Sequence, residues 1–231
     1  MIRLRAPGVT GQNGDMKHAF PCGCLPLDLV GTLRARRNER PRECLETPAD
    51  LDDWLDQSGL LPGSHTATPA VLADALILRE AIYALVWARL HGEALPEESV
   101  ALLNLHASAP VLAAELLATP SDTGVTDAAG VAGAADVTGA AASSTSPSAN
   151  DVGWRPRGMA AEALGNIARQ AVAIIGGPDT TLLRECARPE CTQVYLDHSR
   201  GHRREWCSMK TCGSRVKAAA YRARKRDETL A

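Results

Sequence analysis

Four stretches of the chain place apolar residues at intervals of three, four and seven, which is the pattern of a helix with one buried face. Two of them start with Thr-Pro, where the threonine hydroxyl can cap the helix and the proline takes the first helical position. Glycine ends both of these helices, and Gly-Gly-Pro ends the last one. The sequence therefore predicts a mostly helical domain. The predicted helices span residues 47–59, 68–92, 96–105 and 159–175.

Three other regions lack helical periodicity. Residues 25–33 are apolar but short, and their pattern suits a strand or a short helix. Residues 1–20 are polar and are predicted to be disordered. Residues 119–151 hold 23 Ala, Gly, Ser or Thr among 33 residues, so they cannot bury enough apolar surface to offset the entropy lost on ordering. We predict a flexible linker or insertion there, because glycines and a proline disfavour the alternative of an Ala-rich helix.

Composition narrows the class of protein. The chain has 231 residues, 45% of them apolar, and a formal net charge of −2, which allows one ordinary domain and a small one. No run approaches the ~18 consecutive apolar residues of a membrane-spanning helix, and the first residues lack the apolar core of a signal peptide. We therefore expect a cytoplasmic protein without membrane association, in a compartment that keeps cysteines reduced.

Four of the seven cysteines form two pairs near the C-terminus, Cys186 with Cys191 and Cys207 with Cys212, separated by 15 residues. Two turns that each aim two thiolates at one point suit a tetrahedral zinc ion. Closing such a site supplies folding energy that a short segment cannot obtain from its own core. The spacing therefore predicts one structural Zn²⁺ held by these four residues.

Alternatives remain open at this cluster. The cysteines can instead form a disulfide pair or stay free, although a reducing compartment disfavours the disulfide. A histidine between the pairs, His198 or His202, can replace one thiolate. The other three cysteines, Cys22, Cys24 and Cys44, are predicted to be ordinary free thiols. The alternative for Cys22 and Cys24 is metal binding or redox chemistry, although they are too close together for a usual zinc pair.

The charge is divided unevenly along the chain. Residues 184–226 carry 12 basic and 4 acidic residues, a net of +8, whereas the rest of the chain carries a net of −10. From residue 213 to 226 there are six basic residues, no acid and four alanines, which predicts a basic helix directly after the last cysteine. Such a cluster is typical of nucleic-acid binding. The alternatives are a solvated charged helix or a basic face that docks on the acidic body.

The residues around these cysteines resemble the CGNR zinc-finger family. The resemblance covers residues 184–226, and Ser214 stands where the family motif normally has Asn. It implies a treble-clef-like zinc finger that binds nucleic acid. The residues that carry it are Tyr195, Asp197, Ser199, Arg204, Trp206, Cys207, Ser208, Met209, Cys212, Gly213, Arg215, Lys217, Tyr221, Arg222 and Arg224.

The preceding part resembles the ABATE domain, through residues 27–32, 51–55, 78–83 and 103–104. Gly31 replaces the Asn common before Thr32 in that domain, and the low-complexity segment looks like an insertion. The resemblance implies a ligand-sensing or regulatory domain ahead of the finger. The expected fold class is α+β: a mostly helical N-terminal domain with a small sheet, then the finger and the basic C-terminal helix. The expected parts are residues 1–20, 21–118, 119–151, 152–183, 184–226 and a tail at 227–231.

Arg79 stands out inside the apolar second helix, next to Glu80. A buried arginine can bind an anionic ligand such as a carboxylate, and Asp28 and Thr32 are candidates for the same pocket. The alternative is an ion pair within the protein or an arginine whose head reaches the solvent.

These features predict a transcription regulator that binds nucleic acid, with DNA favoured, and senses a small molecule or a regulatory protein through its N-terminal domain. The alternative is a zinc-stabilised protein-interaction module. An enzyme is not expected, because we find no catalytic motif and four thiolates leave zinc no open position. The candidate nucleic-acid contacts are Arg204, Arg215, Lys217, Arg222, Arg224, Lys225 and Arg226.

Overall fold

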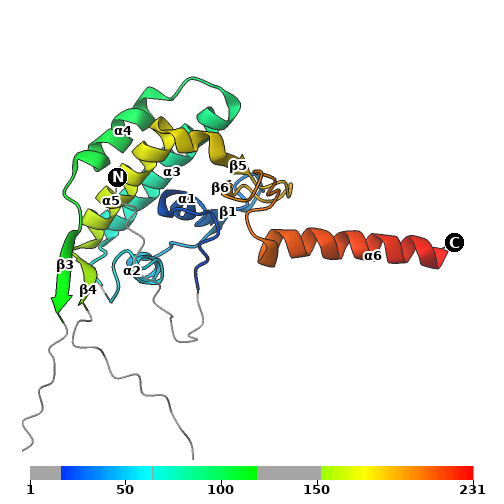
Figure 1. The fold of residues 1–231 in the computed structure, drawn as a ribbon, viewed down its shortest axis with the longest axis horizontal. Coiled ribbons are helices and arrows are strands. Elements are labelled where there is room, and N and C mark those ends of the chain that lie inside the picture. The colour runs from blue at the N-terminus through cyan, green and yellow to red at the C-terminus, as the bar shows by residue number, and fades with distance from the viewer. Residues whose placement is uncertain (1–16, 64, 119–151, 231) are drawn as a thin grey trace, which may run out of the picture. The chain divides into compact units, whose positions relative to one another are not determined.

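A computed structural model describes residues 17–63, 65–118 and 152–230 of the chain (Figure 1). The predicted linker at 119–151 and residues 1–16 of the predicted disordered N-terminus lie outside the described residues. Contacts divide the chain into one unit of residues 1–113 and 156–231 and a second unit of residues 114–155. No helix in the described ranges combines the length and hydrophobicity that a membrane span requires.

The predicted helices are present, and their termini follow from local signals. Thr47 and Thr68 cap the second and third helices, and each hydroxyl accepts a hydrogen bond from the backbone N–H three residues later. Gly92 ends the third helix in the left-handed conformation, with a φ of 69° that glycine adopts without strain. The helices are α1 (Leu25–Val30), α2 (Pro48–Gln57), α3 (Pro69–His91), α4 (Glu97–Ser108) and α5 (Ala160–Gly176). The ambiguous apolar segment therefore begins as a short helix.

The described residues contain three separate two-stranded sheets, which the hydrophobic periodicity of the sequence did not predict. In one pair, Leu33 and Arg34 face Glu43 and Arg42 across an antiparallel ladder. Such short strands carry too few residues for an alternating pattern to be seen. The pairs are β1 (Leu33–Arg34) with β2 (Arg42–Glu43), β3 (Ala113–Ala118) with β4 (Val152–Arg157), and β5 (Leu183–Glu185) with β6 (Val194–Leu196).

The smaller unit, residues 114–155, holds most of the β3–β4 pair. Within it, the Nε of Arg155 donates to a carboxylate oxygen of Glu115 at 2.6 Å. Leu116 keeps 74% of its surface exposed, so this pair buries little apolar area on its own. Among the residues of this unit that the structure describes, the two strands are held together mainly by hydrogen bonds between their backbones.

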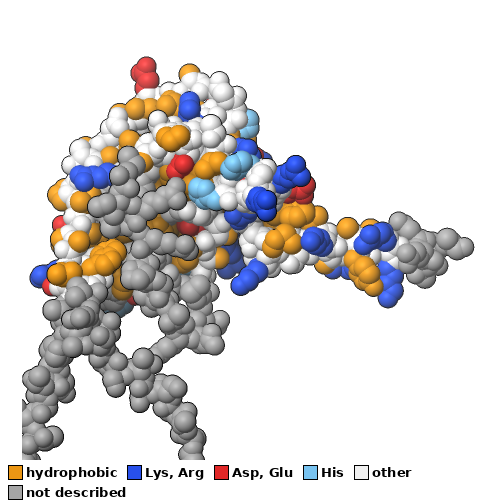
Figure 2. Space-filling model, in the orientation of Figure 1, with side chains coloured by type: hydrophobic (Ala, Val, Ile, Leu, Met, Phe, Trp, Pro, Cys, Tyr) orange, Lys and Arg blue, Asp and Glu red, His pale blue; other side chains and the backbone are white. Residues whose placement is uncertain are grey.

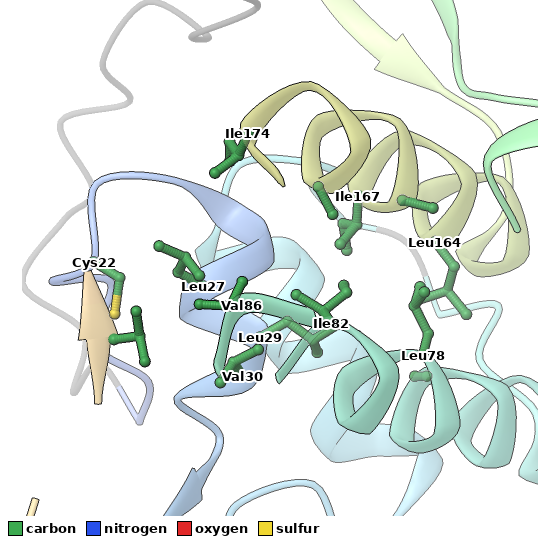
Figure 3. Close-up of a cluster of buried hydrophobic side chains, with 14 of the residues drawn as sticks. Cys22, Leu27, Leu29, Val30, Leu78, Ile82, Val86, Leu164, Ile167 and Ile174 are labelled. Atoms are coloured by element: carbon green, nitrogen blue, oxygen red, sulfur yellow. The ribbon is translucent and has the colours of Figure 1, made fainter. Parts of the chain in front are cut away.

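The core lies where α1, α3 and α5 meet (Figure 3). Leu78 and Ile82 of α3 are fully buried against Ile167 of α5 and the apolar residues of α1. The sequence predicted one buried stripe on α3, and the buried residues extend beyond a single stripe to a wider face of the helix. The reason is that α3 has α1, α2, α4 and α5 as neighbours and therefore presents more than one face to protein.

Residues 17–20 are packed against the body, so the prediction of disorder to residue 20 is wrong at this end. His18 is 4% exposed, and its backbone N–H donates to the side-chain oxygen of Gln57 at 3.0 Å. The ring of Phe20 lies 5.6 Å from that of Trp54, centroid to centroid. Lys17 forms an ion pair with Asp50. These contacts join residues more than 30 positions apart, which local composition does not report.

The C-terminal segment packs onto the helical body and shares its hydrophobic core. The backbone N–H of Leu196 donates to the carbonyl of Cys22 at 2.9 Å, which adds a contact between β6 and the segment before α1. Val194 and Leu196 are buried in the same cluster as α1, α3 and α5. The expected boundary near residue 184 falls within β5, so the finger and the helical body form one packed unit.

Two arginines of the β1–β2 connection strengthen this junction. The backbone N–H of Arg36 donates to the hydroxyl of Thr192 at 3.2 Å, and Arg37 donates to the carboxylate of Glu185 at 2.5 Å. The guanidinium groups also lie over aromatic rings of α3, that of Arg36 at 4.3 Å from the Tyr83 centroid. One short loop therefore contacts both the helical body and the β5–β6 pair.

Candidate metal centre and basic helix

The first cysteine pair is positioned by the β5–β6 hairpin. Cys186 follows β5, and its N–H donates to the carbonyl of Gln193 at 3.0 Å, which closes the base of the connecting loop. Within the loop, the N–H of Cys191 donates to the carbonyl of Arg188 at 2.8 Å. This turn folds the chain back so that both thiols face the same point.

The second pair leads into the C-terminal helix. Cys212 lies in the π-helical turn η2 (Met209–Gly213), which continues as α6 (Ser214–Leu230), beyond the predicted helix end at 226. A Cβ at Gly213 would lie 2.6 Å from the sulfur of Met209, so any other residue here would displace the exposed end of that side chain. The N–H of Gly213 donates to the carbonyl of Ser208 at 3.0 Å and closes the turn.

Ser214, which stands at the asparagine position of the motif, makes a local hydrogen bond. Its hydroxyl donates to the carbonyl of Met209 at 2.6 Å, at the start of η2. The side chain therefore ties the first residue of α6 to the turn that carries Cys212. A shorter polar residue is able to perform this local task, because the acceptor lies within the adjoining turn.

The four sulfur atoms converge. All four Sγ atoms lie within 4.8 Å of one another, with 3.9 Å between Cys191 and Cys207 and 3.6 Å between Cys207 and Cys212. Thiolates bound at about 2.3 Å to a tetrahedral zinc ion are separated by about 3.8 Å. The observed spacing fits that geometry and is far longer than the ~2.05 Å of a disulfide bond. The residues present therefore fit one structural zinc.

The histidine alternative is not supported by the arrangement. The cluster of potential ligand atoms among the described residues consists of the four cysteines alone. The Nδ1 of His202 is engaged with the backbone carbonyl of Asp197 at 2.8 Å, and His198 is exposed. The other predicted free cysteines, at positions 22, 24 and 44, are likewise outside the cluster and form no disulfide.

Positive charge lies next to the thiols. The guanidinium of Arg188 is 3.9 Å from the sulfur of Cys212, and it also pairs with Glu190 at 2.8 Å. Hydrogen bonds from Cys191 and Cys207 lower the pKa of Cys186, so the cluster favours negative charge at that sulfur. Four thiolates around a divalent cation leave a net negative charge, which Arg188 partly offsets. The sequence did not predict this role for Arg188. Its position between Cys186 and Cys191 was the one signal that could have indicated it.

A buried aspartate and an arginine brace the loop before the second pair. Asp197 is fully buried, and its carboxylate accepts from the N–H groups of Ser199 at 2.9 Å and Arg204 at 3.0 Å. The guanidinium of Arg204 lies over the ring of Tyr195 at 4.4 Å and donates to the carbonyl of Pro21 at 2.8 Å. It also donates to the carbonyl of Cys207.

Arg204 is thus separated from the other predicted nucleic-acid contacts. Its donors are directed at backbone carbonyls inside the protein, and its side chain is half-buried. The six basic residues of α6, by contrast, are all exposed. We therefore leave Arg204 out of the basic surface and define the α6 basic surface by the other six. These are Arg215, Lys217, Arg222, Arg224, Lys225 and Arg226.

The basic side chains project along the length of α6 (Figure 2). At 100° per residue, Arg215, Arg222 and Arg226 form one row, and Lys217 and Arg224 form another. Between the rows lie small apolar residues at positions 216, 219, 220 and 223. None of the five cations in these rows forms an ion pair with a described residue. The helix therefore presents cationic donors on both flanks of a narrow smooth strip.

The predicted ligand residues do not form one pocket. Arg79 is 4% exposed, and its guanidinium donates to both carboxylate oxygens of Glu43 at 2.7 and 2.8 Å. It also donates to the hydroxyl of Thr32 at 3.1 Å and to Glu80 at 2.8 Å. Asp28 instead faces the N–H of Cys22. The charge of Arg79 is thus neutralised by carboxylates of the protein itself, which agrees with the alternative of an internal ion pair.

Replacing Arg79 with Ala is expected to lower the free energy of unfolding by about 2–4 kcal/mol, because Glu43 is left half-buried without its bidentate partner. The expected loss is below that for a fully buried pair, since Glu43 keeps 27% of its side chain exposed and can be rehydrated. Urea unfolding measures the effect. Arg89→Ala, an exposed change on the same helix, is the control, and an equal response of both variants would contradict this role.

Asp28 is expected to make stability depend on pH. Burial raises the pKa of this 4% exposed carboxyl to about 7. Its stabilising contribution is then fully present below about pH 3.8 and lost as pH rises through about 7, because the folded state holds the proton more tightly than the unfolded state. Asp28→Asn removes this titration and keeps an oxygen to accept from Cys22.

The variant should therefore gain stability relative to the wild type by up to about 3 kcal/mol as pH rises from about 5 to about 8. Urea unfolding of both proteins across this range measures the difference. Parallel pH profiles would show that the carboxyl of Asp28 is ionised throughout.

Comparison with known families divides the chain at β5. The model of the ABATE family, described as "Putative stress-induced transcription regulator", matches residues 23–178. The model of the CGNR zinc finger matches residues 183–225 and contains all four clustered cysteines. Comparison with curated proteins finds no match. Both resemblances drawn from the sequence are confirmed by these matches.

Proposed function

From the premise that this chain belongs to the ABATE family and ends in a CGNR zinc finger, we propose that it regulates transcription by binding DNA through α6. The observation that carries the proposal is the α6 basic surface, six exposed cations on one helix. Such a surface attracts phosphates, and releasing their counterions drives binding. In this proposal the finger contacts the DNA, and the ABATE domain regulates that binding.

The shape of α6 favours a DNA groove as its site. A helix with side chains has a diameter of about 10–12 Å, which matches the ~12 Å width of the B-DNA major groove. The strip at positions 216, 219, 220 and 223 has small side chains and permits close approach to base edges, where apolar groups contact thymine methyls. The deep, narrow major groove of duplex RNA does not admit a helix in this way, which is why DNA is favoured over RNA.

The metal centre would set the direction of this helix. When bound, zinc cross-links the β5–β6 loop to η2, and α6 continues directly from η2. Arg204 and Asp197 hold the loop between the two cysteine pairs in place. A fixed helix loses less conformational freedom on binding than a flexible tail of the same charge, and this supports a specific contact.

The regulatory half of the proposal rests on the junction between the body and the finger. Arg36 and Arg37 contact α3 and the β5–β6 pair at the same time. A small molecule or a protein that binds the helical body and displaces this loop would change how the finger is held. We therefore assign ligand or partner sensing to the ABATE domain.

Titration of a short DNA duplex with the zinc-loaded full chain tests the proposal, with fluorescence anisotropy as the measurement. The logarithm of the binding constant should fall by about 0.9 for each phosphate contact per tenfold rise in salt, so four to six contacts give a slope of about −4 to −5. A single-stranded RNA and an RNA duplex serve as comparisons. Absence of binding at low salt would overturn the proposal.

A protein-interaction module is the second candidate, because Met209 and Tyr221 keep 50% and 60% of their surfaces exposed beside the cations. Exposed Met and Tyr are frequent at protein interfaces. Retention on heparin discriminates the two functions: the nucleic-acid proposal expects salt-sensitive retention that weakens when α6 arginines are replaced. Retention that is unaltered by those changes would favour the interaction module. Neither candidate requires catalysis, since four thiolates would leave zinc no open position.

A further inference from the structure

A cavity of about 560 Å³ lies apart from the finger, between residues 17–18, the β1–β2 pair and the start of α2. Its size falls in the range of small-molecule sites, about 300–1,000 Å³. Charged side chains dominate its wall. Those that matter are Lys17, Arg34, Arg42, Glu43, Glu46 and Asp50, together with His18.

Two arginines face each other across the ladder at this cavity. Arg34 of β1 and Arg42 of β2 are directly opposed partners in the antiparallel register, so their side chains leave the same face of the pair. Like charges in such positions destabilise a strand pair. Both are exposed, and neither forms an ion pair with a residue in the described ranges. Their repulsion is relieved when an anion lies between them.

Most of the acids around the cavity are already occupied. Arg79, which does not line the cavity, donates two hydrogen bonds to the carboxylate of Glu43. Asp50 pairs with Lys17 and accepts from the N–H of Thr47 at 2.8 Å as part of the α2 cap. The lining as a whole carries three cations and three carboxylates, but this pairing leaves Arg34 and Arg42 against the single exposed carboxylate of Glu46. Positive charge is therefore available to a ligand locally, between the two arginines.

His18 provides a second, independent sign of a ligand. The side chain is 96% buried, yet its Nε2 has no hydrogen-bond partner in the described part of the chain. Burial lowers the pKa of the imidazole, so it is neutral at physiological pH and offers one donor and one acceptor. Leaving a buried polar atom unsatisfied costs about 1–3 kcal/mol. Nε2 has almost no solvent contact, so a ligand hydroxyl or carbonyl in the cavity would recover this energy only after the ring turns toward it.

We propose that this cavity binds a small organic acid with one carboxylate, held between Arg34 and Arg42, and with an oxygen of its body bonded to His18. Two planar guanidinium groups match the geometry of a carboxylate better than a point charge does. The local group of Arg34, Arg42 and Glu46 has a net charge of +1, which suits a monocarboxylate, and the carboxylate of Glu46 disfavours a multiply charged phosphate.

The location connects this site to the sensing half of the proposed function, although binding of the acid does not depend on DNA binding. Arg34 and Arg42 flank the loop that carries Arg36 and Arg37. A carboxylate that draws β1 and β2 together therefore acts on the segment that contacts Thr192 and Glu185 of the finger.

Isothermal titration of the zinc-loaded full chain with benzoate, 4-hydroxybenzoate and inorganic phosphate tests the proposal. Benzoate should bind, and its affinity should fall at least about tenfold in Arg34→Ala and in Arg42→Ala, because each loses half of the guanidinium pair. Arg40→Ala is the matched control, since it removes an exposed arginine of the same loop that does not line the cavity. Its affinity for benzoate should equal that of the wild type.

The comparison of 4-hydroxybenzoate with benzoate tests the role of His18. The hydroxylated probe should bind more tightly than benzoate, and His18→Phe should remove that advantage, so that the two probes bind with similar affinity. Binding of phosphate without benzoate, no heat with either carboxylate at about 10 mM, or equal effects of the Arg34 and Arg40 changes would each overturn the proposal. Because the readout is the acid itself, a failure here is distinct from a failure of DNA binding.

Discussion

Replacing Cys207 with Ser is expected to remove the single zinc ion and to unfold the finger. Cys207 lies at the centre of the sulfur cluster, 3.9 Å from Cys191 and 3.6 Å from Cys212. A structural zinc site contributes about 10–16 kcal/mol of binding free energy in zinc-finger peptides, and this is also folding free energy because the site does not exist in the unfolded chain. Losing one of four thiolates removes much of this stabilisation.

Native mass spectrometry measures the metal directly: the wild type should carry one zinc and Cys207→Ser none. Cys44→Ser is the control, because it makes the same chemical change at a partly buried cysteine that lies outside the cluster. It should keep its zinc. A Cys207→Ser protein that retains one tightly bound zinc would refute the four-cysteine site.

The effect of zinc loss should extend into the helical body. Val194 and Tyr195 of β6 are fully buried in the shared core, and Arg204 holds the carbonyls of both Pro21 and Cys207. When the finger unfolds, these contacts are lost together. A strong chelator should therefore lower the melting temperature of the whole protein, and an unchanged melting transition of the helices would show that the two parts are energetically independent.

The second large effect is expected from Arg222→Ala combined with Arg226→Ala. These residues lie one turn apart in the same row of α6 and are exposed. Removing two phosphate contacts should reduce the salt slope by about 1.8 and the DNA affinity by about 10- to 100-fold at about 0.1 M salt. Alanine is the best helix former, so α6 itself should persist.

The matched control is Arg40→Ala combined with Arg89→Ala, which removes two exposed arginines from outside the finger. Its anisotropy titration should keep the wild-type salt slope, and its circular dichroism should resemble that of the α6 variant. An equal loss of affinity in both double variants would mean that net charge, rather than the α6 basic surface, governs binding.

Local signals were sufficient for the helices and for the metal ligands. The Thr-Pro starts at 47 and 68 and the stop at Gly92 act through hydrogen bonds within a few residues, so the sequence alone locates them. The same holds for the cysteine pairs, because each turn is closed by neighbouring residues such as Arg188 and Ser208. The basic helix was also evident, since charge and alanine content are local properties.

Contacts between distant residues were decided only by the tertiary structure. The sequence singled out Arg79 but not its partner Glu43, which lies 36 residues away and reaches it through the β1–β2 pair. It grouped Arg204 with the nucleic-acid contacts, whereas packing directs that guanidinium to backbone carbonyls.

The opposed Arg34 and Arg42 likewise became visible only through strand register. The sequence by itself therefore determined which helices form, which thiols can hold zinc and where the positive charge lies. The tertiary structure decided which of the polar side chains are neutralised and which remain available. The physical reason is that helix caps and metal turns depend on near neighbours, whereas the partner of a buried charge is chosen by how distant segments pack.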